Sequence, residues 1–270
     1  MSLRIHPVSK AGSVAAVRAD GHPLSFLEFG VLRLTPTNPV ITLTFPGREA
    51  VILLLEGAAT VRGGEQGGDM GPRGSVFDDL PWAVYIPPGV ALNVRVRESM
   101  LAAVATAPAT AHKRVQLISP SHTSERVVGA NNWTRRVRSV VDQRVSERLL
   151  VGETVNPAGN WSSYPPHKHD RLTDAGELPM EEVYYYTVRP DSGFGLQLIY
   201  SAPDDPESLD EMYRVRGGDL VLLPRGYHPV VAAAGYELHY VWAIAGPRVV
   251  SGAWSDDPAH AWIRQLEHGR

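Results

Sequence analysis

Short apolar segments, broken at close intervals by glycine and proline, run along most of this chain. The 270 residues include 25 glycines and 22 prolines, more than average usage. Residues 50–55 form an apolar run that ends at Glu56-Gly57, and residues 83–86 lead into Pro87-Pro88-Gly89. Short apolar runs between turn residues are typical of β-strands. The pattern therefore predicts an all-β protein built from sandwiches or barrels.

The expected elements follow this punctuation. We expect strands over residues 24–35, 40–45, 50–55, 59–62, 83–86, 91–96, 101–105, 135–141, 149–156, 161–169, 182–188, 195–201, 212–215, 219–223, 229–234 and 236–244. Near the end, Asp257-Pro258 offers a cap and a proline at the first helical position, which predicts a short helix over residues 259–266. Trp262 and Ile263 are expected to pack that helix against the strands.

The chain divides almost evenly into two parts. A length of 270 residues accommodates one large domain or two of ordinary size. Residues 107–114 are loop-like, and Ser119-Pro120 marks a second break. We therefore expect a boundary near residue 125, with one β domain over residues 1–125 and another over residues 126–270.

Charge and composition exclude several classes of function. A formal net charge of −3 gives no electrostatic case for binding nucleic acid or an anionic membrane. The absence of cysteine excludes disulfides, thiol catalysis and zinc sites built on sulfur. Because no signal-peptide run or stretch of 18 apolar residues is visible, we expect a cytoplasmic protein. A homo-oligomer is left open.

Three pieces of the second half carry the candidate chemistry. His167 and His169 flank Lys168, so both imidazoles share one face of an extended segment. Glu182 opens a run of β-forming residues, and His228 follows a Pro-x-Gly turn after an apolar strand. Three imidazoles and one carboxylate suit Zn, Fe, Mn, Ni or Cu. We expect these four residues, His167, His169, Glu182 and His228, to bind one divalent metal ion.

The order and strand context of these motifs resemble the cupin pattern. A His-x-His pair alone is weak evidence, because ten histidines in 270 residues produce one by chance about 0.4 times. Solvated loop histidines are the ordinary alternative for such a pair. In cupins, a Glu opens the strand after His-x-His, three or four residues on. Here twelve residues, 170–181, intervene, so Glu177 and Glu181 stay open as alternatives to Glu182.

The first half repeats parts of the cupin pattern without its histidines. Pro87-Pro88-Gly89 matches the second motif's turn, and residues 48–57 look like the strand after the first motif. We interpret residues 1–125 as a degenerate cupin domain that lost its metal, with an unrelated β domain as the alternative. The resemblance thus implies a bicupin: two β-sandwich (jelly-roll) domains and a short C-terminal helix.

Sequence around the motifs narrows the resemblance to one family. Residues 160–170, which read Asn-Trp-Ser-Ser-Tyr-Pro-Pro-His-Lys-His-Asp, are similar to the signature of 5-deoxy-glucuronate isomerase, an enzyme of inositol breakdown. Further similar segments are residues 181–186, 193–200, 217–221, 226–229, Trp254 and residues 257–262. In the first half the match is mostly one of length and strand order. A related bicupin isomerase, which acts on 5-keto-4-deoxyuronate in pectin breakdown, is the nearest alternative.

This resemblance implies an aldose–ketose isomerisation. The C1 aldehyde of 5-deoxy-D-glucuronate becomes a hydroxymethyl group and its C2 hydroxyl a ketone, giving 5-dehydro-2-deoxy-D-gluconate. One divalent metal ion, with Zn preferred over Mn, Fe or Ni, would polarise the carbonyl and stabilise an enediolate. A metal-dependent bicupin dioxygenase and a non-enzymatic sugar-acid-binding cupin are the rival hypotheses.

Three candidates for catalysis lie on strands beside the motifs. Tyr184 and Tyr186 share the face of Glu182 by the period of two, although most strand tyrosines simply pack. Gln197 interrupts an apolar strand, so it faces either the substrate or solvent. Either tyrosine is a candidate for the group that moves the proton.

The carboxylate of the substrate requires a cation. Lys168, Arg171 and Arg225 all lie near the motifs and are the candidates, with solvation at the surface as the alternative for each. Lys168 alternates away from His167 and His169 if the strand is regular, which counts against it.

Overall fold

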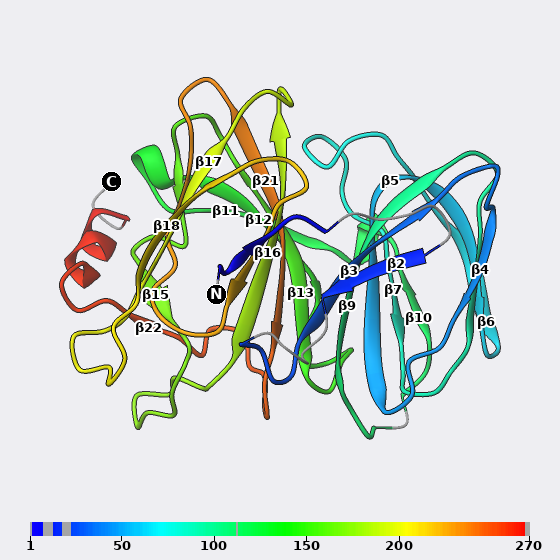
Figure 1. Ribbon diagram of the computed structural model, residues 1–270, viewed down its shortest axis with the longest axis horizontal. Coiled ribbons are helices and arrows are strands. Elements are labelled where there is room, and N and C mark those ends of the chain that lie inside the picture. Colours follow the sequence, from blue (N-terminus) through cyan, green and yellow to red (C-terminus); the bar gives the residue numbers. More distant parts are fainter. Residues whose placement is uncertain (1, 8–12, 18–22, 112, 268–270) are drawn as a thin grey trace.

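The computed structural model describes residues 2–7, 13–17, 23–111 and 113–267. Strands make up about half of this part of the chain, and the helices within it are short 3-10 turns (Figure 1). Neighbouring strands in the central sheets pair antiparallel. The expected all-β fold is confirmed.

Strands of the second half form one large sheet and two smaller ones, and the candidate motifs lie on or between these strands. In order across the large sheet lie β1 (Arg4–Ile5), β19 (Leu220–Leu223), β16 (Glu181–Arg189), β21 (Glu237–Ala245), β13 (Leu149–Asn156), β12 (Arg135–Val141) and β11 (Ser124–Val128). A second sheet contains β14 (Trp161–Ser162), β20 (Val230–Ala232), β17 (Gly195–Tyr200) and β18 (Asp210–Val215). β15 (His167–Lys168) pairs with β22 (Ser255–Asp256).

The described strands of the first half form one further sheet. Its main path is β10 (Gln116–Ile118), β7 (Ala83–Ile86), β5 (Arg48–Gly63), β9 (Met100–Pro108), β3 (Glu28–Leu34) and β2 (Ser13–Val17). β6 (Gln66–Arg73) and β8 (Leu92–Arg95) also pair with β5, and β4 (Val40–Leu43) pairs with β8. The 3-10 helices are η1 (Pro120–His122), η2 (Asn131–Trp133) and η3 (Ala261–Glu267).

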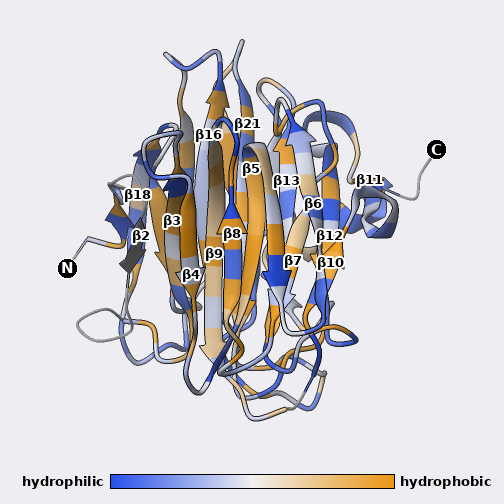
Figure 2. Cartoon of the chain, turned by 90° about the vertical axis from the view of Figure 1, so that its right-hand side faces the viewer, coloured by the Kyte–Doolittle hydropathy of each residue, from blue (hydrophilic) through white to orange (hydrophobic). Residues whose placement is uncertain are grey.

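Residues 50–55 of strand β5 are buried on both faces, which explains their unbroken apolar run (Figure 2). Ile52 and Leu54 point into the core of the first half, whereas Val51, Leu53 and Leu55 point into a core shared with the second half. Full burial of each such side chain contributes about 1.5–3 kcal/mol. The two halves therefore pack sheet against sheet, and β5 contributes side chains both to this interface and to the core of its own half.

The predicted break at Glu56-Gly57 is wrong, because β5 runs on to Gly63. Its pairing shifts register between Leu54 and Glu56 and again between Gly57 and Ala59, so the strand continues through an irregularity. Gly57 has φ +91°, and a Cβ there would lie 2.1 Å from the Ser99 carbonyl oxygen. The glycine permits this close approach instead of ending the strand.

The sheets do not divide cleanly at residue 125. Arg4–Ile5 pairs with β19 and therefore lies in the sheet of the second half, on the left in Figure 1. β11, over Ser124–Val128, forms the opposite edge of that sheet. The two-domain division at residue 125 and the degenerate cupin interpretation of residues 1–125 stay predictions.

The C-terminal helix is a 3-10 helix, η3, shifted slightly from the expected range. Asp257 caps the turn over residues 258–260 that leads into η3, since its Oδ1 accepts a hydrogen bond from the Ala259 N–H at 2.9 Å. Ile263 is 5% exposed and packs inward, but Trp262 is 57% exposed. The prediction that both residues pack is wrong, because adjacent residues in a three-residue turn point in different directions.

A buried ionic cluster joins the two halves at their interface. Glu153, on β13, accepts hydrogen bonds from Arg73 of the first half at 2.6 Å and from Arg138 at 2.7 Å. Its other oxygen lies 3.1 Å from His239 Nε2. Burial raises the pKa of Glu153, but His239 and Arg73 outweigh it and lower that pKa to about 2. The carboxylate therefore stays ionised between two guanidinium groups.

Glu153→Gln should lower the free energy of unfolding by about 3–5 kcal/mol, because it leaves the buried Arg73 without an anion and Arg138 with only the partly exposed Glu125. Glu125→Gln is the matched control. That carboxylate also binds Arg138 but is 32% exposed, so its loss should cost under about 1 kcal/mol. Urea unfolding followed by tryptophan fluorescence measures both. Equal losses would contradict a central role for Glu153.

The stability difference between wild type and Glu153→Gln should change with pH in one direction. A carboxylate whose pKa is depressed in the folded state contributes fully to stability above its unfolded-state pKa of about 4.3. That contribution is lost as the pH falls through its folded-state pKa. The difference in unfolding free energy between wild type and Glu153→Gln should therefore narrow as the pH is lowered from about 5 towards 3.

Candidate metal centre

Three side chains from separate elements meet inside the second half. His169 follows β15, Glu182 is the second residue of β16, and His228 lies between β19 and β20. One ligand atom from each lies within 4.8 Å of the other two. All three are buried, with no more than 5% exposed. We call these three residues the trio.

The turn that presents His228 depends on glycine. β19 ends at Leu223, and residues 224–226 reverse the chain. Gly226 has φ +88°, and a Cβ there would lie 2.7 Å from the Tyr200 carbonyl oxygen. Any larger residue would strain the turn and move His228 relative to Glu182.

Hydrogen bonds decide which ring nitrogens face the centre of the trio. His169 Nδ1 lies 2.8 Å from the Met180 carbonyl oxygen, and His228 Nδ1 lies 2.9 Å from that of Gly226. A carbonyl only accepts, so each Nδ1 donates and each Nε2 of a neutral ring presents a lone pair. These Nε2 atoms lie 3.1 Å and 3.3 Å from the same oxygen, Glu182 Oε2.

Such a set of converging acceptors fits a cation. His228 Nε2 is buried and has no hydrogen-bond partner among the described residues. A buried polar atom left in this way costs about 1–3 kcal/mol. A divalent ion would satisfy both nitrogens and the carboxylate. In each ring the nitrogen on the far side, Nδ1, bonds a main-chain carbonyl oxygen, as is usual for metal-binding histidines. The donor set therefore could hold a metal ion.

The electrostatics of the trio favour an ionised carboxylate. Burial raises the pKa of Glu182, but the neighbouring rings of His169 and His228 outweigh it and hold that pKa below its usual range. Burial lowers the pKa of His169, yet the adjacent Glu182 carboxylate raises it overall. The negative charge is thus held in place by its two neighbours.

His167 lies beside the trio but is not part of it. Its ring centroid is 5.1 Å from that of His228 and 5.3 Å from that of Trp254. Burial lowers the pKa of His167 well below its usual value, and the charges of His228, His169 and Arg135 lower it further. A neutral imidazole in this position could serve as a fourth ligand, and its assignment stays a prediction.

The prediction of one strand over residues 161–169 is wrong. β14 ends at Ser162, and β15 begins only at His167. Between them Ser163 has φ +50°, in the left-handed region, and two prolines follow. Proline has no N–H to donate to a ladder, so the intervening residues cannot continue the strand.

The three candidate glutamates have three different environments. Glu177 accepts a hydrogen bond from Lys168 Nζ at 2.8 Å, inside the loop of residues 170–181. Glu181 accepts the backbone N–H groups of residues 25–27, which belong to the first half. Glu182 alone of the three lies with the two histidines. Its position at the start of β16 is the arrangement expected from the sequence.

The three basic candidates are already paired with carboxylates of the chain. Lys168 is only 3% exposed, so solvation at the surface is excluded for it, and its Nζ lies 2.5 Å from Asp170 Oδ1. Arg171 and Arg225 each lie 3.5 Å from Asp205. Their role in substrate binding stays a prediction.

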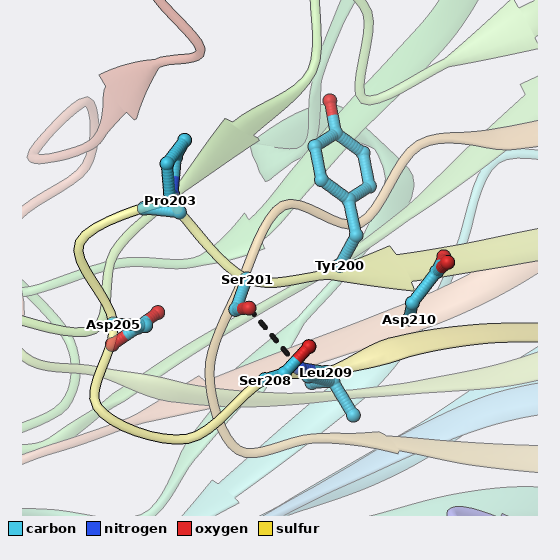
Figure 3. A pocket seen from close by; sticks show the side chains of 8 residues that line it. Tyr200, Ser201, Pro203, Asp205, Ser208, Leu209 and Asp210 are labelled. Carbon is cyan, nitrogen blue, oxygen red and sulfur yellow. Dashed lines mark hydrogen bonds between the residues drawn. The ribbon is translucent and has the colours of Figure 1, made fainter.

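Asp205 also lines a hollow of about 390 Å³ on the surface (Figure 3). This hollow lies along residues 200–210, where Ser201 Oγ accepts a hydrogen bond from the Leu209 N–H. None of the trio lines it. Arg171 and Arg225 therefore pair with a carboxylate of this surface loop.

Tyr184 is the phenol that lies beside the trio. Its ring centroid is 6.0 Å from that of His228, and its Oη is 2.7 Å from Ser163 Oγ. Burial raises the pKa of Tyr184 well above 10, with smaller contributions from neighbouring groups. The phenol therefore keeps its proton at neutral pH.

Gln197 faces neither solvent nor an open site. It is fully buried, and its Oε1 accepts a hydrogen bond from Tyr186 Oη at 2.5 Å. Its Nε2 donates to the carbonyl oxygens of His228 at 2.9 Å and Pro229 at 3.1 Å. Both interpretations from the sequence therefore need correction, because its partners are groups of the protein. Gln197 and Tyr186 fix the backbone that carries His228.

Sequence reasoning missed Ser163, Tyr240 and Arg135. Ser163 sits in the break between two strands, where no periodic signal operates. Tyr240 bonds Ser162 and packs against Tyr184 at 4.4 Å between ring centroids. Arg135 is one of several arginines at the start of β12, and only the register of the sheet shows which of them face inward.

Known proteins of one family resemble this chain along almost its whole length. The model of the KduI/IolB family matches residues 5–263. The chain belongs to the KduI/IolB family. It is 36% identical to a 5-deoxy-glucuronate isomerase of Geobacillus thermodenitrificans, over 96% of this chain and 94% of that one. A 5-deoxy-glucuronate isomerase of Lacticaseibacillus casei is 34% identical, over 97% and 98% of the two chains.

Solved structures support the fold. An IolB-like protein of Salmonella typhimurium superposes with a TM-score of 0.91 at 31% identity, covering 98% of this chain and 100% of that one. A mutant of Bacillus subtilis oxalate decarboxylase gives a TM-score of 0.64 at 12% identity, over 95% and 80% of the chains, which shows the fold alone. None of the helices in the described residues is long and apolar enough to cross a membrane.

Glu182→Gln should lose at least about tenfold in metal affinity, because a neutral amide replaces the only anionic donor of the trio. Glu177→Gln is the matched control, since that residue lies five positions earlier and binds Lys168 instead. Elemental analysis after dialysis against a weak chelator measures the bound metal. Loss of metal in the Glu177 variant with retention in the Glu182 variant would contradict the assignment.

Proposed function

We propose that this chain is a metal-dependent 5-deoxy-glucuronate isomerase that forms 5-dehydro-2-deoxy-D-gluconate in inositol breakdown. The observation that carries the proposal is the buried convergence of His169, Glu182 and His228, in a chain whose relatives bear that name over almost their full length. We assign the activity to the cytoplasm. A homo-oligomer stays a prediction.

The proposed reaction is a redistribution of hydrogen within one molecule. The C2 hydrogen leaves as a proton and a proton is added at C1, while the C2 hydroxyl proton moves to the C1 oxygen, so no oxidant or reductant is consumed. A divalent ion held by the trio, with His167 as a fourth ligand, would polarise the substrate oxygens and acidify the C2 hydrogen. Nitrogen and carboxylate donors favour Zn, with Mn, Fe or Ni as alternatives.

Tyr184 supplies a proton beside the trio. Because burial raises its pKa well above 10, it acts as a protonated phenol that can donate to an oxygen gaining negative charge. Ser163 Oγ, 2.7 Å away, can exchange that proton with it. The left-handed backbone of Ser163 costs about 1 kcal/mol or more, which fits a residue held in place for its side chain.

Isomerisation should proceed under anaerobic conditions without a nicotinamide and should stop when the metal is removed by a chelator. Restoring the metal should restore turnover. In deuterium oxide, solvent deuterium should enter the product at C6, the former aldehyde carbon, because the hydrogen moves as an exchangeable proton. Proton NMR of the product measures both conversion and labelling.

Strict oxygen consumption would favour a dioxygenase instead. A metal-loaded protein that converts no deoxy-uronate would favour a sugar-acid-binding protein. Conversion of 5-keto-4-deoxyuronate in preference to 5-deoxy-glucuronate would place the chain with the related isomerase of pectin breakdown.

Tyr184→Phe should lower kcat about 10²-fold, because it removes a proton donor used along the reaction path, while KM changes little. Tyr185→Phe is the matched control: the adjacent residue faces the opposite side of β16, and its ring packs 5.7 Å from that of Phe29. Steady-state kinetics with metal-loaded protein tests both. An unchanged kcat in the Tyr184 variant would remove that residue from the mechanism.

A further inference from the structure

The proposed substrate carries a carboxylate at the end opposite its aldehyde, and one guanidinium of the second half is suited to receive it. Arg135 opens β12, and its side chain is mostly enclosed. One of its terminal nitrogens donates to the main-chain carbonyl oxygens of Trp133 at 3.0 Å and Tyr164 at 3.3 Å. Its Nε is buried and has no hydrogen-bond partner among the described residues.

Arg135 differs from Arg73 and Arg138 because none of the described carboxylates pairs with it. Arg73 and Arg138 both bond Glu153. Among the described residues, no carboxylate forms an ion pair with Arg135. Glu267, whose charge reaches it from a distance, instead accepts a hydrogen bond from Trp133 Nε1 at 3.0 Å. A guanidinium has five N–H donors, and enclosing one without a counter-charge is costly unless an anion completes it.

The register of the sheet turns Arg135 towards the site. Arg136 pairs with Val155, so Arg135 lies opposite Asn156, one residue further along. On that face the pairing continues through Thr154 and Tyr240 to Tyr186, the face that also carries Glu182 and Tyr184. Arg135 also donates to the Tyr164 carbonyl oxygen, and the preceding residue, Ser163, lies with its Oγ 2.7 Å from Tyr184 Oη. Arg135 and the trio therefore belong to one inward surface.

A second buried group on this surface lacks a partner. Asn156 is fully buried, and its Oδ1 accepts no hydrogen bond from the described residues, although its Nδ2 donates to the Asn160 carbonyl oxygen at 3.3 Å. An unmatched acceptor beside an unmatched cation suits a molecule that offers hydroxyl donors next to an anion. A sugar acid has both.

We infer that Arg135 binds the carboxylate of the substrate and so sets the preference for a uronate over a neutral sugar. This inference rests on the proposed function and deepens it. Lys168, Arg171 and Arg225 are less suited to the task, because each is already paired with a carboxylate of the chain. A site built around a charged group rejects an analogue that lacks its partner much more strongly than an apolar pocket does.

The test compares two substrates on the metal-loaded protein: 5-deoxy-D-glucuronate and 5-deoxy-D-glucose, in which a hydroxymethyl group replaces the carboxylate. Arg135→Met should lower kcat/KM for the acid about 15- to 150-fold, the range for hydrogen bonds to a charged group, and change the value for the neutral sugar far less. Arg135→Lys keeps the charge but not the planar fork, so its loss should be about tenfold.

Arg225→Met is the matched control, because it removes a guanidinium whose partners are Asp205 and Glu207. It should keep the preference for the acid. Calorimetric binding of the unreactive acid made by reducing the substrate aldehyde gives a readout without turnover, and it should weaken in Arg135→Met only. Metal content and thermal midpoint identify a variant that has merely lost its fold, in which case Arg135→Lys carries the test.

The outcomes separate the inference from the function on which it rests. A wild-type protein that isomerises neither substrate overturns both. A wild-type protein that isomerises the acid, with Arg135→Met losing equally on both substrates, overturns the inference and leaves the function standing. Collapse of the preference in Arg225→Met instead of Arg135→Met also overturns it.

Discussion

Strand β16 is enclosed on both faces, and the rest of the molecule is arranged around that constraint. Its odd-numbered residues, such as Glu181 and Tyr185, face the first half, while Glu182 and Tyr184 face the candidate metal centre. A slip of one residue would exchange the two sets and bury the wrong groups on each side. The packing between the halves therefore holds the site in register, although no candidate ligand comes from the first half.

Carboxylates reach across the interface in both directions. Glu181 accepts the backbone N–H groups of residues 25–27, and Glu49 of the first half accepts those of Glu147 at 2.9 Å and Arg148 at 2.6 Å. These backbone bonds form only when the halves are joined, although Glu49 Oε2 also accepts a hydrogen bond from Tyr85 Oη of its own half at 2.9 Å. The first half thus has a physical role in support of the site, whatever its ancestry.

The sequence predicted regular strands well and interruptions poorly. Residues 135–141 and 149–156 match β12 and β13 because turn residues bound them on both sides. The strand over residues 161–169 was wrong because Ser163 adopts a left-handed backbone that serine rarely takes. Glu182 could be preferred over two nearby glutamates because it directly precedes the run of β-forming residues 183–186. Arg135 could not be found, since the inward face of an Arg-Arg-Val-Arg segment is set by pairing with β13 and not by the segment itself.

The supports of the trio are groups of the main chain, which ties its geometry to the fold. The Met180 and Gly226 carbonyl oxygens orient the two rings, and Gln197 holds the carbonyl oxygen of His228. The fold itself recurs at low sequence identity, as the likeness to oxalate decarboxylase at 12% identity shows. What distinguishes one chemistry from another must then lie in the inward side chains around the centre. Here those are a protonated phenol near the trio and an unpaired guanidinium further along the same sheet. This arrangement suits a substrate that reacts at one end and is bound through a carboxylate at the other.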